Sequence, residues 1–121
     1  MQQHTLRPTA LVVEDDADQR ELVSALLEEC EMAVIQCESA ESAEVVLERV
    51  GGSLSMIFAD VNLAGDMTGT ELAVLAKSRF PNLTVIVTSG SHAPALPAGA
   101  MFMQKPWRAL DILREAERAL H

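Results

Sequence analysis

The sequence predicts an α/β domain built on a five-stranded parallel sheet with helices on both faces. Two observations lead to this fold class. Short apolar runs alternate along the chain with segments whose apolar residues recur at helical spacing, which is typical of a parallel sheet with helical crossovers. The apolar runs are also continuous, without regular polar positions, as expected for strands that are buried on both faces.

The first half of the chain alternates three predicted strands with two predicted helices. Asp16 or Asp18 is placed to cap the first helix, and Ser39 or Ser42 to cap the second, which Gly51 and its neighbour end. The apolar residues of the first helix are Leu22, Val23, Leu26 and Leu27. The predicted elements are a strand at 10–15, a helix at 16–30, a strand at 33–37, a helix at 39–50 and a strand at 55–60.

The second half contains a weaker crossover. The segment 91–100 links the fourth and fifth strands, and its two prolines leave little room for a full helix, so we expect a loop or a single turn there. The inward residues of the last helix are predicted to be Leu110, Ile112, Leu113, Ala116 and Leu120. The predicted elements are a loop at 61–69, a helix at 70–80, strands at 84–90 and 100–104, and a helix at 107–120.

The composition fits one domain and narrows the classes of partner. We assign residues 1–8 of the 121 to an N-terminal tail and 9–121 to one domain. With 18 acidic and nine basic residues, the net charge of −9 argues against direct binding to nucleic acid or to an anionic membrane, and permits a cation or a basic protein. The chain shows no signal peptide and no apolar run near the ~18 residues of a membrane span, so we expect a cytoplasmic protein.

Cysteine and histidine give no sign of a disulfide or a zinc site. We expect Cys30 and Cys37 to be reduced, partly buried thiols. His4, His92 and His121 lack the spacing of zinc ligands.

Polar side chains stand where the predicted strands end. The acidic run 14–16 follows the first strand, Asp60 ends the third, and Thr88 and Lys105 end the fourth and fifth. Because the carboxyl ends of parallel strands lie on one edge of the sheet, these groups are predicted to share one site. Carboxylates in such a run repel one another, so the run is either a solvated turn or a site for a hard cation such as Mg²⁺. A cation, a lysine and a hydroxyl together suit a phosphoryl group, for which a carboxylate can be the nucleophile.

Four segments carry a resemblance to a known family. The stretches "LVVEDD" (11–16), "IFADVNLAGDMTG" (57–69), "VIVTSG" (85–90) and "FMQKPW" (102–107) have the order and closely similar spacing of the family's motifs. Over residues 9–120 the chain resembles the CheY-like receiver domain of bacterial two-component response regulators. The resemblance implies a flavodoxin-like, doubly wound sheet with strand order 2-1-3-4-5.

The resemblance also assigns roles at the strand ends. It implies that Asp60 is the phosphoacceptor and that Lys105 is the phosphate partner. It implies that Glu14 and Asp15 are the acidic pair that binds Mg²⁺ or Mn²⁺, with Asp15 as a direct ligand. Asp60 itself and the backbone carbonyl of Asn62 complete the set of metal ligands that the resemblance implies.

Further roles concern the switch and the lifetime of the phosphoryl group. Thr88 resembles the switch hydroxyl, and Phe102 occupies the position of the switch aromatic. Asn62 and Gly90 flank the route of the hydrolytic water in this family. The peptide bond before Pro106 would be cis, as in the family.

The chain departs from the family pattern in two places. Ala64 replaces a proline in a loop that is one residue longer than usual, so we expect a looser loop. The stretch from Thr88 to Lys105 is several residues short, so we expect a fourth helix that is short or absent. That shortening puts the usual dimer interface in doubt, and we expect a monomer or a weak dimer. Phe102 also lacks the hydroxyl of a tyrosine.

Several polar or aromatic residues receive simpler predictions. Asp16 is expected to be solvated or to cap a helix, and Asp66 to lie in a surface turn. Ser89 is a small residue that leaves access for a phosphoryl group. Trp107 is expected to pack at the start of the last helix, and His92 to be a solvated loop residue.

These observations predict a Mg²⁺-dependent receiver that takes a phosphoryl group on Asp60 from a histidine kinase or a histidine phosphotransfer protein. It would then switch its binding to a downstream protein target and catalyse only its own phosphorylation and dephosphorylation. We expect it to be stand-alone or part of a hybrid kinase or longer regulator. Three alternatives remain. A phosphohydrolase would need a cap insertion, which the sequence does not contain, and a flavodoxin-like cofactor carrier would bind a phosphate that the acidic stretch "EDDAD" would repel. The third alternative is a phosphate-independent interaction module.

Overall fold

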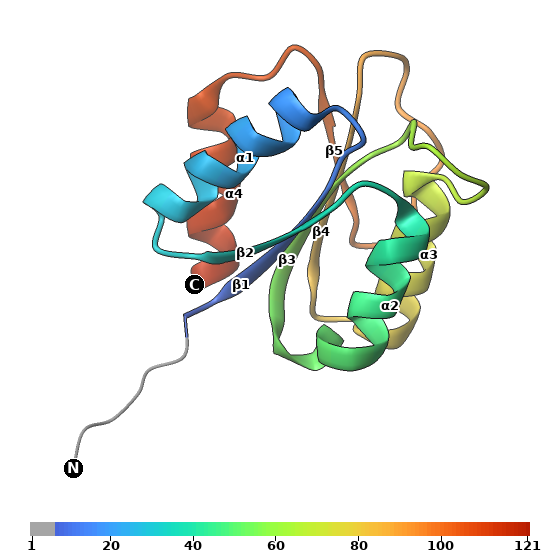
Figure 1. Ribbon diagram of the computed structural model, residues 1–121, viewed down its shortest axis with the longest axis horizontal. Helices are drawn as coiled ribbons and strands as arrows, with labels where there is room; N and C mark the ends of the chain where they lie inside the picture. Colours follow the sequence, from blue (N-terminus) through green and yellow to red (C-terminus); the bar gives the residue numbers. More distant parts are fainter. Residues whose placement is uncertain (1–6) are drawn as a thin grey trace.

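The computed structural model describes residues 7–121, and its helices and strands alternate as predicted (Figure 1). The strands are β1 (Thr9–Val13), β2 (Ala33–Cys37), β3 (Leu54–Asp60), β4 (Thr84–Ser89) and β5 (Met101–Gln104). The helices are α1 (Ala17–Glu29), α2 (Ala40–Val50), α3 (Gly69–Arg79) and α4 (Ala109–Leu120), and a 3₁₀ turn spans Gly51–Ser53. All neighbouring strands are parallel, in the order β2-β1-β3-β4-β5. The predicted fold class and strand order are confirmed.

Each face of the sheet has its own core. Helices α1 and α4 cover one face, and α2 and α3 cover the other (Figure 1). On β1, Leu11 and Val13 face α2 and α3, whereas Ala10 and Val12 face α1 and α4, and all four are fully buried. Because both faces of the strand are covered, all four of these positions are apolar, which explains the continuous runs in the sequence.

Side-chain caps begin the first three helices. The Asp16 carboxylate accepts the backbone N–H of Gln19 at 3.0 Å, which confirms its capping role. Ser39 caps α2 in the same way. The hydroxyl of Thr68 accepts the N–H of Glu71, whose side chain accepts the N–H of Thr68, so α3 starts with a reciprocal capping box. These caps fix where each helix leaves the carboxyl edge of the sheet.

The crossover between β4 and β5 has no helix. Residues 90–100, which the structure describes in full, run from a bend at 90–91 through an irregular stretch to a turn at 98–99, with Gly99 at a φ of 86°. Leu96 and Ala100 pack on the core between the sheet and α2 and α3. The expected loss of the fourth family helix is confirmed, so helix α4 of this chain is the one that follows β5. Strand β5, which lies at the edge of the sheet, is short and partly exposed.

Some predictions at single positions differ from the structure. Leu110 on α4 was expected to point inward but is 49% exposed, and Leu22, one of the regularly spaced apolar residues of α1, is 52% exposed. Each helix turns only one arc toward the sheet, and Val23, Leu27 and Ile112 occupy it. Strand β1 ends at Val13, so Glu14 already belongs to the loop.

Three further predictions concern the cysteines, the N-terminal tail and membrane spans. Cys37 is buried and Cys30 half-buried, and both are free thiols in the described chain. Most of the predicted tail, residues 1–6, lies outside the described residues. Between residues 7 and 121, none of the helices is both long enough and apolar enough to span a bilayer.

Candidate functional site

The carboxyl ends of β1, β3, β4 and β5 bring four predicted site residues to one edge of the sheet: Glu14, Asp60, Thr88 and Lys105. Asp60 and Thr88 are directly paired across β3 and β4. The backbone N–H of Val61 donates to the carbonyl of Thr88 at 2.9 Å, and the N–H of Lys105 donates to the carbonyl of Ser89 at 2.9 Å. The parallel ladder therefore continues one residue past β3 and β5 and sets the starting point of each loop.

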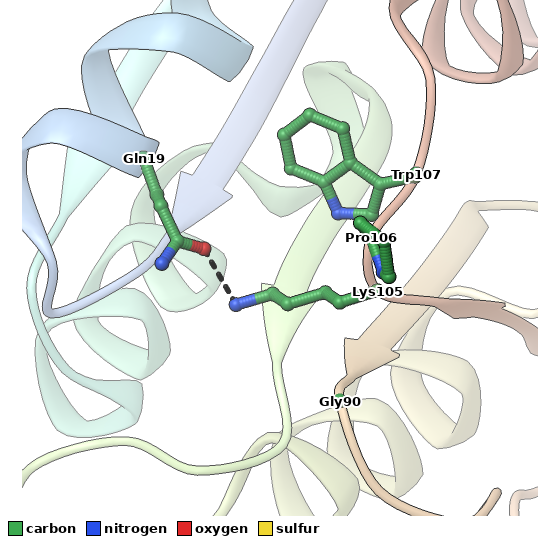
Figure 2. Close-up of a pocket in the computed structure, with 5 residues that line it drawn as sticks. All are labelled: Gln19, Gly90, Lys105, Pro106 and Trp107. Carbon is green, nitrogen blue, oxygen red and sulfur yellow. Dashed lines mark hydrogen bonds between the residues drawn. The ribbon is translucent and has the colours of Figure 1, made fainter.

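The Lys105 ammonium lies at the centre of this edge. Its Nζ donates to Oε1 of Glu14 at 3.2 Å, to Oδ2 of Asp60 in a close ion pair, and to Oε1 of Gln19 at 2.6 Å. A lysine ammonium has three N–H donors, so all three are used. Figure 2 shows the Lys105 side chain reaching from the end of β5 to Gln19 on the first turn of α1.

Both carboxylates that contact Lys105 are buried: Glu14 is 6% exposed and Asp60 is 7% exposed. Burial is the main reason that the pKa of Glu14 rises to about 7, and the nearby Asp60 carboxylate adds to the rise against the opposing Lys105 charge. Burial alone would lower the pKa of Lys105, but its contacts with Asp60 and Glu14 outweigh burial and raise it. The site therefore keeps Lys105 charged and makes the Glu14 carboxylate easier to protonate than an exposed glutamate.

Backbone groups fix the Asp60 carboxylate. Its Oδ1 accepts the N–H of Asn62 at 2.8 Å, while Oδ2 contacts Lys105. Helix α3 begins close to the backbone of Asp60, because a Cβ at Gly69 would lie only 2.0 Å from the Asp60 carbonyl oxygen. A glycine at this position lets the helix approach the strand end, so the loop 61–68 starts and ends beside Asp60.

The Thr88 hydroxyl is buried beside Asp60. Thr88 is 1% exposed, and its Oγ1 has no hydrogen-bond partner among residues 7–121. A buried hydroxyl without a partner is costly in a native protein and suggests a ligand or a second state that satisfies it. Phe102 is half-buried on β5 and pairs with Val87, the strand neighbour of Thr88.

The remaining predicted site residues lie at the solvent side. Asp15, Asn62 and Gly90 are exposed. Asp15 and Glu14 do not form a three-residue metal group with Asp60, and no such group of His, Cys, Asp or Glu side chains occurs elsewhere in the described part of the chain. The donors at this edge are nevertheless all oxygens, namely carboxylates and backbone carbonyls, and this chemistry suits a hard cation that keeps several waters. The donor chemistry at this edge therefore fits Mg²⁺.

A cavity of about 460 Å³ opens beside Lys105 (Figure 2). It is lined by Gln19, Gly90, Lys105, Pro106 and Trp107, and the Lys105–Pro106 bond is cis as expected. The Trp107 ring packs edge-on against Phe58 with 6.0 Å between ring centroids, which confirms its predicted packing role. The cavity leaves one side of the Lys105 side chain open to solvent.

Sequence reasoning did not identify Gln19. A glutamine in the first turn of a helix carries no local signal, because its partner Lys105 is 86 residues further along the chain. Only the placement of α1 against the end of β5 reveals the contact. His92 and Asp66 are exposed, in agreement with their simpler predictions.

The sequence profile of the response regulator receiver domain matches residues 10–117. The chain belongs to this family. The receiver domain is 34% identical over 109 residues to the response regulator protein FleR of Pseudomonas aeruginosa, a match that covers 85% of this chain and 22% of FleR. The chain thus spans about a fifth of the length of that relative.

Solved receiver structures share its fold. A CheY-like receiver domain protein from Methanospirillum hungatei superposes with a TM-score of 0.84 at 25% identity, covering 95% of this chain and 94% of that one. The beryllofluoride-activated receiver domain of DrrB gives a TM-score of 0.82 at 23% identity, covering 95% and 98%. Receiver domains serve two-component signalling, generally bind Mg²⁺ at the phosphorylation site and interact with histidine kinases or phosphotransfer proteins.

Proposed function

We propose that this receiver domain accepts a phosphoryl group on Asp60 in a Mg²⁺-dependent reaction and changes its binding to a partner protein in response. The observation that carries the proposal is the Lys105 ammonium between two buried carboxylates, Glu14 and Asp60, at adjoining strand ends. Asp60 is already oriented by Lys105 and by the N–H of Asn62. A nucleophile held in this way loses little freedom at the moment of reaction.

The donor is a phosphohistidine on a histidine kinase or a phosphotransfer protein. An Asp60 carboxylate oxygen attacks the phosphorus, the P–N bond breaks, and its electron pair stays on the departing imidazole. The product is an acyl phosphate on Asp60. Lys105 then donates to a phosphoryl oxygen in place of the Asp60 oxygen that it contacts now, which stabilises the transferred charge.

Glu14, Asp15, Asp60 and the Asn62 carbonyl would hold the Mg²⁺ (or Mn²⁺). When bound, the cation supplies positive charge that offsets the carboxylate cluster and the phosphoryl oxygens. Glu14 must be ionised to act as a ligand, and its raised pKa makes this step depend on pH.

The response to phosphorylation involves Thr88 and Phe102. The Thr88 hydroxyl, which has no partner among the described residues, donates to a phosphoryl oxygen on the neighbouring Asp60. The Phe102 side chain then changes its position on the partly exposed strand β5. The change shifts the population of two surface states and so alters binding of a downstream target. Hydrolysis of the acyl phosphate, with Asn62 and Gly90 beside the route of the water, resets the switch. The domain acts on its own aspartate and on no separate substrate.

Intact-mass spectrometry tests the proposal. The protein is incubated with Mg²⁺ and acetyl phosphate, and one phosphoryl group, a gain of ~80 Da, is expected. The gain should need Mg²⁺, disappear in Asp60→Asn and remain in the matched control Asp66→Asn, whose side chain is exposed in the same loop. If the wild-type protein gains no mass and binds no beryllofluoride, the chain is a phosphate-independent interaction module and the proposal fails.

A further inference from the structure

Gln19 is fixed on a rigid element that faces the phosphoacceptor edge. It lies in the first turn of α1, and its backbone N–H is held at 3.0 Å by the carboxylate of Asp16, the cap of that helix. The next residue, Arg20, donates through Nη1 to the carbonyl of Glu14 at 2.8 Å, which ties the same turn to the end of β1. The Gln19 side chain therefore starts from a well-anchored point and crosses to Lys105 on the far side of the site (Figure 2).

Gln19 differs in kind from the other two acceptors of Lys105. Glu14 and Asp60 are carboxylates that, in the proposed reaction, take on a metal ion or a phosphoryl group. Gln19 is a neutral amide whose charge does not change at any step, and at 2.6 Å its contact with Nζ is shorter than that of Glu14 at 3.2 Å. It is thus the one acceptor of the three that can keep its bond throughout the reaction.

We propose that Gln19 is a positioning residue for Lys105, which fixes one N–H of the ammonium so that the others point at the phosphoryl group on Asp60. This inference rests on the proposed function. It assigns to the start of α1 a part in setting the phosphorylation rate, separate from binding of the metal or of the phosphodonor.

The cavity next to Lys105 explains why such a positioning residue is needed. Lys105 and Gln19 both line this space of about 460 Å³, together with Gly90, Pro106 and Trp107. A flexible lysine without the Gln19 acceptor can turn one N–H, or its whole ammonium, toward water in the cavity. In doing so it loses alignment with Asp60, and the stabilisation of the transferring group falls.

Two substitutions at position 19 separate positioning from packing. Gln19→Leu keeps a helix-compatible side chain of similar size but removes the acceptor. Gln19→Glu keeps an acceptor oxygen in reach of Lys105 and adds a charge. The matched control is Gln104→Leu, the same change at the exposed residue just before Lys105.

The experiment measures the phosphorylation rate as a function of acetyl phosphate and Mg²⁺ concentration, with the fluorescence of Trp107, the single tryptophan, as the signal. We expect Gln19→Leu to lower the maximal rate about tenfold, the effect of one charge-assisted hydrogen bond, with the half-saturating Mg²⁺ concentration unchanged. Gln19→Glu should keep most of the maximal rate and need more acetyl phosphate, because its charge repels the donor. Gln104→Leu should match the wild type.

Three results would overturn the inference. The first is an unchanged maximal rate in Gln19→Leu. The second is an equal loss of rate in Gln19→Leu and Gln19→Glu, since the acceptor would then not be what matters. The third is a loss that appears only as weaker Mg²⁺ binding. A wild-type protein that is never phosphorylated would instead refute the proposed function, so the two failures are distinguishable.

Discussion

The Glu41 side chain on α2 binds the backbone of Met67 in the loop after Asp60: its Oε2 accepts the backbone N–H of Met67 at 2.8 Å and also that of Asp66 at 2.9 Å. Ser39, just before α2, forms an isolated parallel bridge with Ala64 in the same loop. The start of α2 therefore anchors the loop that follows Asp60. Ala64 stands where the family usually has a proline, and these contacts from α2 lie directly beside that position.

Removing the anchor should loosen that loop. In Glu41→Ala the N–H groups of Asp66 and Met67 lose their acceptor and are expected to exchange with solvent at least about tenfold faster, the effect of one net hydrogen bond. Amide hydrogen exchange by NMR measures the change. Glu48→Ala, at an exposed position on the same helix, is the control. Unchanged exchange at both amides would show that Glu41 does not hold the loop.

Gly65 in the same loop is expected to tolerate a side chain poorly. Its φ is 100°, and a Cβ there would lie 2.7 Å from Oε1 of Glu41. Gly65→Ala should lower the free energy of unfolding by about 1–2 kcal/mol, because it combines backbone strain with a contact that is too close. Urea unfolding measures it. At Gly52 a Cβ would meet no heavy atom of the described chain within 4 Å, so Gly52→Ala should cost less, and equal losses would count against the prediction.

The charge of Glu14 should make the metal-free protein less stable as the pH rises. Burial raises its pKa from 4.5 to about 7, so between these values the folded protein binds more protons than the unfolded chain. The free energy of unfolding of the wild type should therefore fall from about pH 4.5 to about pH 7, relative to Glu14→Gln, which cannot ionise. Lys105 stays charged throughout this range, because its pKa is raised above 10.5.

Urea unfolding in a chelator and in Mg²⁺ tests this pH dependence. In chelator, the free energy of unfolding of the wild type is compared with that of Glu14→Gln at several pH values. Added Mg²⁺ should reduce the loss of stability that the wild type shows as the pH rises. Parallel pH profiles for the two proteins would mean that Glu14 has an ordinary pKa in the folded state.

The fold could be predicted from the sequence because its signals are local. Each buried strand is a continuous apolar run, and each ends in a chemically distinct residue such as Asp60 or Lys105. The contacts of Gln19 and Glu41 were out of reach, because each joins residues far apart in the chain and polar side chains in a first helical turn are common. The exposure of Leu110 was missed because helical spacing alone does not show which arc meets the sheet.

The Thr88 hydroxyl is expected to lower the stability of the unphosphorylated protein and to be needed for its response to a phosphoryl group. Its buried Oγ1 has no partner among the described residues, so Thr88→Val, which has nearly the same shape, removes an unsatisfied polar atom. We expect the free energy of unfolding of the unphosphorylated protein to rise by about 1 kcal/mol. The same change removes the donor to a phosphoryl oxygen, so the Trp107 fluorescence response to Mg²⁺ and beryllofluoride should be lost or strongly reduced. Thr84→Val, at the other end of β4, should leave that response intact. A Thr88→Val protein that is less stable than the wild type and responds normally would show that the hydroxyl serves the resting fold and not the switch.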